Sequence, residues 1–392
     1  MKNNLFLYFT ILFVTSTAFA QLTLTNGNHT LEISGSLSAY YNYRALKPGE
    51  TERDKDRFKM RDAQLQLEGR IGNIWEYELQ VDFADMSANN NNGTPDPENP
   101  GLMDAYVVYK GLGFMDIQAG YGKLYYSRNA MVPFAYSPYW QRADLTRGDI
   151  FSSRDVGITF IKTFWNQRIN AYAGIYTGLG ELSLNGDNDA SGQPEYAGRV
   201  DFSYPSRFRY REIDDRITPI PMFSFGINGR YANKAIPDGE VMVPNSGGAY
   251  GLKVINGKRY VYGFDAAFQY MGFSGQFELH QIKGEPKLPT DPLLHNLTAD
   301  QTGGYFLAGG YVAQVNYFAK KIKTVFSARY EELDLNDLVA GNSRRFSPAI
   351  AYQIDGFDAM IKFQYFNVLK EESIDPFKWQ EQYRIGIQLN FK

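Results

Sequence analysis

The chain has 392 residues, of which 21% are charged, and its formal net charge is −3 at pH 7. This slightly acidic balance argues against a nucleic-acid partner, because such partners are bound by clustered Lys and Arg. The sequence contains no Cys, so an exported protein of this size would depend on backbone pairing and packing instead of disulfides. Aromatic residues make up 16%, chiefly Tyr and Phe, and these residue types favour strands.

The first twenty residues have the pattern of a secretory signal peptide. Lys2 precedes the apolar run LFLYFTILFV, and Ala-Phe-Ala at 18–20 supplies a small-x-small cleavage site before Gln21. A retained membrane anchor is the alternative, but the run is short and no charge cluster follows it. We therefore expect a signal peptide at 1–20 and a mature, exported chain over 21–392.

Segments of about ten residues that alternate apolar and polar side chains recur along the mature chain. In the last segment, Ile385, Ile387 and Leu389 fall on one face, whereas Arg384 and Gln388 fall on the other. Sixteen segments of this kind predict strands: 31–43, 58–70, 75–84, 102–110, 115–123, 154–163, 168–177, 195–204, 222–231, 259–270, 274–283, 304–317, 322–331, 345–354, 358–368 and 379–391.

The connections between these segments alternate between short and long. The short ones are 71–74, 112–114, 164–167, 271–273, 319–321 and 355–357. The long ones are 44–57, 85–101, 124–153, 178–194, 232–258, 284–303, 332–344 and 369–378. One connection, 205–221, is long where the alternation requires a short turn; a periplasmic extension and a misassigned strand pair both remain open.

This alternation is typical of outer-membrane barrels, in which short turns and both termini lie on the periplasmic side. In hydrocarbon, strands satisfy their backbone groups only if the sheet closes on itself. We therefore predict an all-β, transmembrane antiparallel β-barrel of about 16 strands in a single domain. It would be integral to the outer membrane of a Gram-negative cell and contact its lipids, with short periplasmic turns, long extracellular loops and aromatic girdles. Segment 379–391 would close the ring against 31–43, with Phe391 at the periplasmic rim.

With the apolar faces toward lipid, the polar faces would line the lumen. A barrel of this width leaves an aqueous channel, because side chains from the wall cannot fill it. An alternative is that most lumen charges pair across neighbouring strands and only hold the wall. The basic residues expected on the lumen wall are Arg70, Arg199, Arg230, Arg329, Lys362 and Arg384. The acidic ones are Glu32, Glu68, Glu78, Asp82, Asp201, Asp265, Glu278 and Glu331.

The loop at 124–153 is the candidate for a constriction. It is rich in aromatic residues and Pro, and a loop this long and apolar is expected to pack on the protein. If it folds into the barrel, Arg128, Arg142 and Arg147 would lie at the narrowest point, where guanidinium groups favour oxyanions. A cap on the outer rim and a contact with a neighbouring subunit are the alternatives.

Catalytic and metal motifs are missing from the sequence. The three His residues are scattered without metal-ligand spacing, and no G-x-S-x-G, H-E-x-x-H or phosphate-binding Gly loop occurs. We therefore expect no enzyme, no cofactor and no metal. The preferred function is passive diffusion of small hydrophilic solutes through a general or weakly anion-preferring porin. A surface-exposed barrel adhesin or binding protein with a plugged lumen is the alternative, and single-channel conductance separates the two.

Three stretches, MRDAQLQLEGRIGNIWEYELQVDFAD (60–85), LMDAYVVYKGLGFMDIQAGYGK (102–123) and SRDVGITF (153–160), resemble the phosphate-selective porin O/P family, in its Bacteroidetes-type form. The resemblance implies a sixteen-stranded and usually trimeric outer-membrane channel. It also implies that anions such as phosphate pass through an Arg- and Lys-lined constriction. Lys123 is the base that the resemblance places at this constriction.

Overall fold

The computed structural model describes residues 22–46, 49, 56–84, 101–146, 153–178, 180, 192–235, 257–287, 304–334, 342–370 and 379–391. The expected signal peptide at 1–20 and Arg147 of the expected constriction loop lie outside these residues. Within the described ranges, no helix is long and apolar enough to cross a membrane.

Seventeen strands in the described part of the chain form one antiparallel sheet. Their bounds are β1 Leu22–Asn26, β2 His29–Leu46, β3 Arg57–Ile71, β4 Trp75–Asp82, β5 Leu102–Tyr109, β6 Asp116–Lys123, β7 Arg154–Phe164, β8 Ile169–Tyr176, β9 Glu195–Tyr204, β10 Met222–Lys234, β11 Gly257–Tyr270, β12 Phe273–Pro286, β13 Phe306–Ala319, β14 Thr324–Asp334, β15 Asn342–Asp355, β16 Ala359–Lys370 and β17 Trp379–Phe391.

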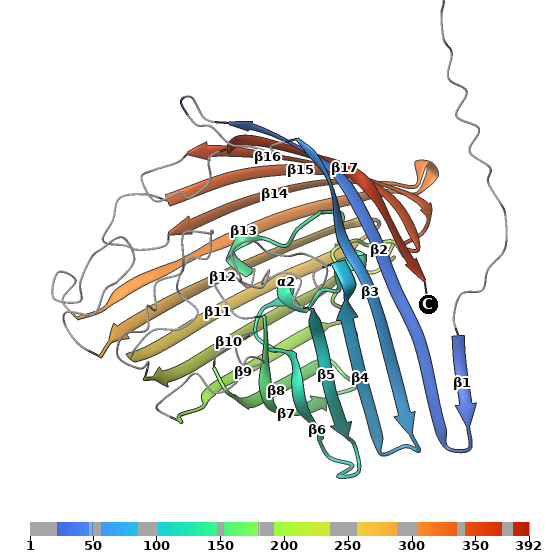
Figure 1. The fold of residues 1–392 in the computed structure, drawn as a ribbon, viewed down its shortest axis with the longest axis vertical. Helices are drawn as coiled ribbons and strands as arrows, with labels where there is room; N and C mark the ends of the chain where they lie inside the picture. Colours follow the sequence, from blue (N-terminus) through green and yellow to red (C-terminus); the bar gives the residue numbers. More distant parts are fainter. Residues whose placement is uncertain are drawn as a thin grey trace, which may run out of the picture.

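Sixteen of these strands, β2 to β17, close into a barrel (Figure 1). Each strand pairs with the next along the chain, and β17 pairs with β2 from Trp379↔Leu46 to Phe391↔Gly35. The predicted sixteen-stranded antiparallel barrel, and its closure by the last strand, are therefore confirmed. Because β17 ends where β2 is near its short-turn end, Phe391 lies at the short-turn rim, which is the side expected to be periplasmic.

The seventeenth strand, β1, was not predicted. It pairs with the beginning of β2, from Leu22↔Ile33 to Asn26↔His29, below the point where β17 stops. All five of its residues are exposed, and it holds only two apolar side chains. A segment so short carries no periodic signal that distinguishes it from a loop.

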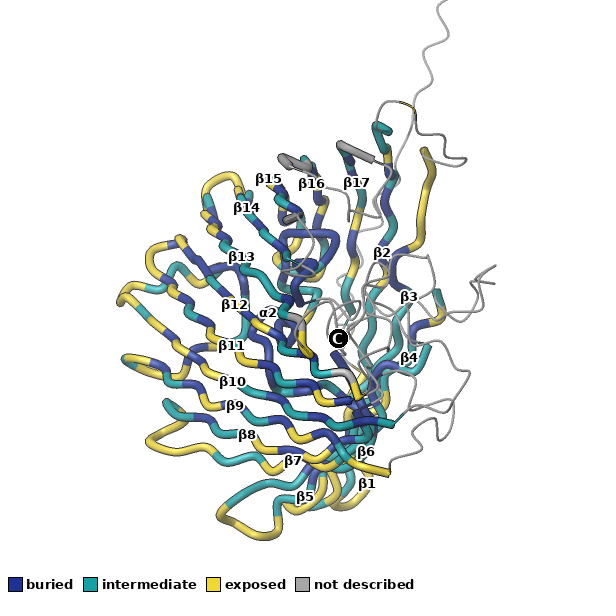
Figure 2. Tube along the Cα trace, turned by 90° about the vertical axis from the view of Figure 1, so that its left-hand side faces the viewer, coloured by how far each residue is buried: buried dark blue, intermediate teal, exposed yellow. Residues whose placement is uncertain are grey.

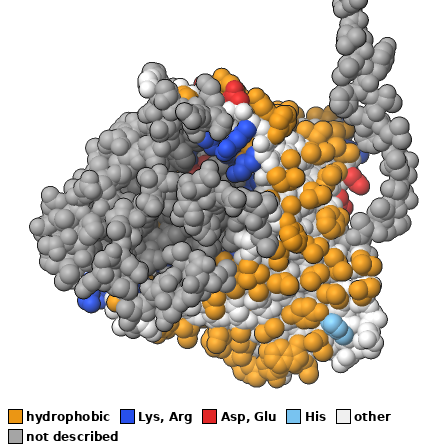
Figure 3. Space-filling view, viewed as in Figure 1, with side chains coloured by type: hydrophobic (Ala, Val, Ile, Leu, Met, Phe, Trp, Pro, Cys, Tyr) orange, Lys and Arg blue, Asp and Glu red, His pale blue; other side chains and the backbone are white. Residues whose placement is uncertain are grey.

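The outer surface of the barrel is apolar. The outward residues of successive strands are large hydrophobic side chains with considerable exposure, and Figure 3 shows them over the wall that carries β2 to β5. Aromatic ring pairs lie on this outer face. The ring centroids of Phe273 and Tyr317 are 4.5 Å apart at the short-turn end, and those of Tyr365 and Tyr383 are 4.8 Å apart farther along the wall. Aromatic residues on the outer face are typical of membrane barrels.

The inner face is polar and well buried. Buried and exposed positions alternate along the strands, as the tube in Figure 2 shows for β9 to β12. The burial arises because short helical segments lie inside the ring beside the wall (Figures 1 and 2). The described helical segments of the lumen are α2 (Arg128–Met131), η1 (Phe134–Tyr136) and η2 (Asp144–Thr146); η6 (Lys320–Ile322) forms the turn between β13 and β14.

Candidate functional site

The loop expected to form the constriction folds into the lumen. Its described part, residues 124–146, leaves the long-loop end of β6 and carries α2, η1 and η2 inside the ring (Figure 1). Ser127 caps α2, because its Oγ accepts a hydrogen bond from the Ala130 amide at 3.0 Å. Trp140 and Leu145 are completely buried. The apolar character of the loop is thus explained by packing within the barrel.

Arg128 anchors the first half of this loop to the wall. It is 1% exposed, and its Nε donates to Asp265 Oδ1 at 3.0 Å, while its Nη2 donates to Ser224. The Asn129 amide next to it donates to Glu278 Oε2 at 2.9 Å. Arg128 is therefore held against β10 to β12 by a charge-assisted pair, and its position fixes the loop.

The second half of the loop is held by β14 to β17. The Trp140 amide donates to Gln364 Oε1 at 2.6 Å, and the Gln141 carbonyl accepts from Arg329 at 3.0 Å. Arg384 donates to Gln141 Oε1 at 2.8 Å, and the Asp144 amide donates to Glu331 at 2.7 Å. Since polar wall residues satisfy the loop backbone, the loop lies inside the barrel without unpaired amides at these positions.

The remaining wall residues named from the sequence also face inward, mostly in ion pairs. Arg199 pairs with Asp265 at 2.5 Å, and Arg230 pairs with the buried Glu195. Lys362 donates to Gln388 at 2.5 Å. Arg70, by contrast, is largely exposed at the short-turn end, where its Nε lies 3.5 Å from Glu76 Oε1. The wall cations thus serve mainly to hold the wall and the loop.

The unexplained connection 205–221 also enters the lumen, from the short-turn side. Ile213, at 1% exposure, packs in an apolar cluster with Phe318, Val325 and Ala351, whose side chains face inward near the turns. Glu212 is buried beside the constriction loop. The expected periplasmic extension is therefore an inward one, and the strand assignment on either side of it is correct.

The exposed side of this connection is basic. Arg207, Arg209 and Arg216 are exposed, and Arg216 with the other nearby guanidinium groups lowers the pKa of Arg209. Burial raises the pKa of Tyr210, whose hydroxyl donates to Asp201 at 2.5 Å. Tyr210 thus stays neutral and anchors the base of the connection to β9, while the exposed guanidinium groups lie at the short-turn end of the barrel.

The space left between the loop and the wall is a cavity of about 480 Å³ beside β2 to β6. It reaches from Lys123 and Arg154, at the long-loop ends of β6 and β7, to Glu32 and Phe391 near the short-turn end. On the loop side it is lined by Pro133, Phe134, Ala135, Tyr136 and Arg142. Because the cavity runs along the barrel axis in this way, it is the candidate permeation route.

The two ends of this cavity differ in charge. Lys123 lies opposite Arg154 in register, and the charges of Arg142, Asp104 and Glu78 also lie close enough to act on it. Arg154 holds Asp104 with two hydrogen bonds of 3.2 and 3.0 Å. From this level a row of carboxylates leads across the wall toward the other end: Glu78, Glu68 and Glu32 lie directly opposite one another on β4, β3 and β2. A solute would therefore meet a basic level and then a row of carboxylates.

Arg61 and Arg154 were not named from the sequence as site residues, although both line the cavity. The Arg61 guanidinium lies 3.6 Å from the centre of the Phe134 ring, and its Nε donates to the Trp140 carbonyl at 2.8 Å. Both arginines precede an aspartate at the long-loop end of a strand, in the motifs MRDA and SRDV. That repeated Arg-Asp pair was the available signal.

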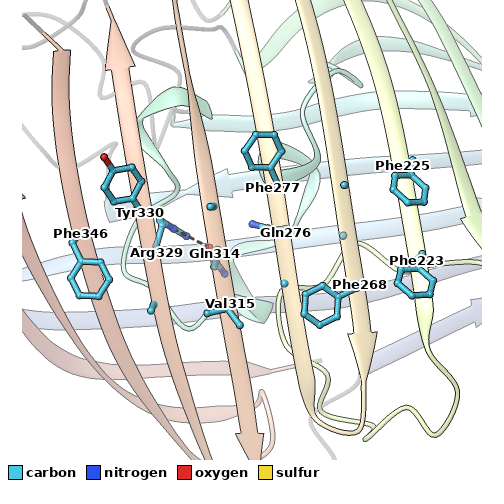
Figure 4. A pocket seen from close by; sticks show the side chains of 15 residues that line it. Phe223, Phe225, Phe268, Gln276, Phe277, Gln314, Val315, Arg329, Tyr330 and Phe346 are labelled. Carbon is cyan, nitrogen blue, oxygen red and sulfur yellow. Dashed lines mark hydrogen bonds between the residues drawn. The ribbon is translucent and has the colours of Figure 1, made fainter.

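A second cavity of about 480 Å³ lies on the outer wall instead of the lumen. Exposed aromatic side chains of β10 to β15, among them Phe225, Phe268 and Phe346, surround it (Figure 4). Arg329 and Gln314, which are bonded to each other at 2.9 Å, belong to the inward face of the same strands. This groove faces the membrane and offers no route for a hydrophilic solute. In the described part of the chain, no group of three or more His, Cys, Asp or Glu could hold a metal ion.

A closed sixteen-stranded barrel with an apolar exterior, a charged lumen and an inserted loop defines an outer-membrane porin, a passive-diffusion channel integral to that membrane. The model of the family described as phosphate-selective porin O and P matches residues 33–206, which confirms the predicted resemblance over that part of the chain. No curated protein matches the chain.

Several solved structures share the fold. An anion-selective porin from Comamonas acidovorans is 11% identical, with a TM-score of 0.58, over 93% of this chain and 100% of that one. The trimer form of OmpT from Vibrio cholerae is 12% identical, with a TM-score of 0.55, over 93% and 99%. The outer membrane channel DcaP of Acinetobacter baumannii is 11% identical, with a TM-score of 0.56, over 94% and 99%. At these identities the likeness concerns the fold alone.

Proposed function

We propose that small hydrophilic solutes cross this porin through the cavity beside β2 to β6, and that its basic level gives a weak preference for anions, phosphate among them. The observation that carries the proposal is the axial cavity with Lys123, Arg142 and Arg154 at one level of it. Guanidinium and ammonium groups at a narrow point lower the electrostatic barrier for anions. The carboxylate row beyond them opposes this effect, so the preference is weak.

Within this proposal, the predicted constriction residues have different roles. Lys123 and Arg142 line the route and act on the solute directly. Arg128 acts only by anchoring the loop, because its guanidinium is buried against Asp265. The solute passes down its gradient and no catalytic step is involved. We further propose a homotrimer, supported by the family resemblance and by the trimeric form of the similar OmpT.

The test is single-channel recording in a planar bilayer, with the reversal potential measured in a KCl gradient. A wild-type channel that opens in discrete steps and prefers chloride supports the proposal. Substituting Lys123→Gln and Arg142→Gln together should lower the anion-to-cation permeability ratio by at least about a factor of five, since even a single unit charge at 4 Å is worth about 1 kcal/mol in water. Phosphate added as a competing ion should reduce the chloride current in the wild type more than in the double variant.

The outcomes separate the proposal from its rivals. A chain that inserts and migrates as a folded barrel but never conducts would favour the plugged binding protein. A channel whose ion preference is unchanged in the double variant would remove these two residues from the constriction. Chemical cross-linking in outer-membrane fragments tests the trimer independently, and a monomer band alone would contradict it.

A further inference from the structure

Glu212 is a junction between three parts of the molecule. It belongs to the connection 205–221, which enters the lumen from the periplasmic side. Its backbone carbonyl accepts hydrogen bonds from Ser274 Oγ at 2.6 Å and from Asn316 Nδ2 at 2.7 Å. These donors lie on β12 and β13, so the backbone of Glu212 is fastened to the barrel wall.

The side chain of Glu212 is fastened to the constriction loop. Its Oε1 accepts from Asn129 Nδ2 at 2.8 Å, and its Oε2 accepts from Ser137 Oγ at 2.6 Å. The Arg329 guanidinium lies 3.7 Å from Oε1 of Glu212, and Glu212 is 4% exposed. A buried carboxylate with several donors is a strong and directional attachment, because each donor would otherwise be left unpaired.

The connection behind Glu212 is itself rigidly held. Asp214 accepts hydrogen bonds from the Gly272 amide at 2.9 Å and from the Thr218 hydroxyl at 2.6 Å. Ile213 and Ile217 contribute to the apolar cluster with Phe318 near the turns. Glu212 is therefore presented to the loop by a fixed base.

The two loop contacts of Glu212 enclose the part of the loop that faces the cavity. Asn129 and Ser137 stand on either side of residues 133–136, all four of which line the cavity. A displacement at either contact would move this stretch relative to the opposite wall of β2 to β5. The width of the route thus depends on a carboxylate that does not line it.

We propose that Glu212 is a positioning residue for permeation, which holds residues 133–136 of the constriction loop in place from the periplasmic side and thereby sets conductance and ion preference. The inference rests on the proposed route through the cavity beside β2 to β6.

The test compares Glu212→Gln and Glu212→Ala with the control Glu285→Gln in the full-length protein in planar bilayers. The Gln variant keeps the shape but loses the negative charge, and its NH₂ group cannot accept the hydrogen bond that the carboxylate oxygen accepts from Asn129 or Ser137. The Ala variant removes the attachment. Glu285 lies on β12 outside the cavity and pairs with Lys283 at 2.6 Å, so Glu285→Gln makes the same substitution away from the loop contacts. In both Glu212 variants the fraction of time in subconductance states should rise about tenfold. The reversal potential should also move toward zero, whereas Glu285→Gln should behave as the wild type.

A second measurement avoids dependence on bilayer insertion. The chain has no native Cys, so Ala135→Cys supplies a single thiol in the stretch that lines the cavity. Its rate of modification by a charged methanethiosulfonate in outer-membrane fragments should change when Glu212→Gln is added and stay the same when Glu285→Gln is added. Unchanged currents, or an unchanged labelling rate, in folded Glu212 variants would overturn the inference. A wild type without conductance would instead contradict the proposed function.

Discussion

Phe391 covers Gly35 across the seam where the barrel closes. The two residues are register partners, and the Cζ atom of the Phe391 ring lies 2.4 Å from the position that a Cβ on residue 35 would occupy. The Gln64 carbonyl oxygen lies 2.3 Å from the same position. A glycine is therefore required here so that the terminal aromatic ring can lie against the strand.

This arrangement predicts that Gly35→Ala weakens the seam. The added methyl group would meet backbone on one side and the ring on the other, at a cost of about 1–3 kcal/mol. The melting temperature of the folded barrel, followed by heat-modifiable migration on gels, should fall. Gly198→Ala is the control, because a Cβ there meets only the Tyr172 carbonyl oxygen at an ordinary 3.5 Å. Equal melting temperatures for the two variants would argue against the packing described for Phe391.

The carboxylate row predicts a change of ion preference opposite to that of the basic level. Substituting Glu32, Glu68 and Glu78 together by Gln removes three like charges that lie directly opposite one another. The anion-to-cation permeability ratio should rise by roughly a factor of five or more. Reversal potentials in KCl gradients measure this, and Glu285→Gln, on β12 outside the route and the adjoining cavity, is the matched control. A ratio that falls or stays constant would place the route elsewhere.

The buried group of Glu195, Arg230 and Arg259 predicts a large loss of stability. Glu195 is completely buried and pairs with both guanidinium groups. Glu195→Ala leaves two buried cations without this carboxylate and should cost about 3–5 kcal/mol in the free energy of unfolding. Glu76→Ala, which removes pairs with Arg70 and Lys110 at the surface, should cost about 0–1 kcal/mol. Urea unfolding in lipid vesicles measures both, and similar losses for the two variants would contradict the assignment.

Cysteine labelling can locate the route without ion measurements. Ser36 lines the cavity, whereas Ser224 and Ser347 are completely buried in the wall behind the constriction loop. Introduced into the Cys-free chain, Ser36→Cys should react readily with a small charged thiol reagent, and Ser224→Cys and Ser347→Cys should react at least about tenfold more slowly. If all three thiols react at the same rate, the loop does not occupy the side of the lumen at β10 to β15.

The architecture was predictable from the sequence because a membrane barrel imposes two regular alternations on it. Side chains alternate along every strand, and connections alternate between short and long along the chain. Sixteen strands and the closing pair of β2 and β17 followed from these two patterns. The strand β1 escaped prediction because five residues do not establish a period.

The roles of individual charges were less accessible, because partners in the lumen are distant in sequence. Arg128 and Arg142 belong to the same loop, yet Arg128 meets Asp265, 137 residues away, while Arg142 lines the cavity. Nothing in the local sequence distinguishes them. The sequence did contain an indication that 205–221 turns inward. Ile213 and Ile217 are apolar residues in an otherwise charged segment, and the inward positions of β13 and β14 near their turn are the apolar Phe318 and Val325.

The constriction loop also has a mechanical relation to the seam. The Trp140 carbonyl accepts a hydrogen bond from Arg61 on β3, and the Ala135 carbonyl accepts one from Gln388 on β17. These two strands lie on opposite sides of β2, so the loop braces the join from within. The narrow passage and the closing pair of strands therefore share their supports, and a change that loosens the pairing of β17 with β2 would also loosen the loop that narrows the channel.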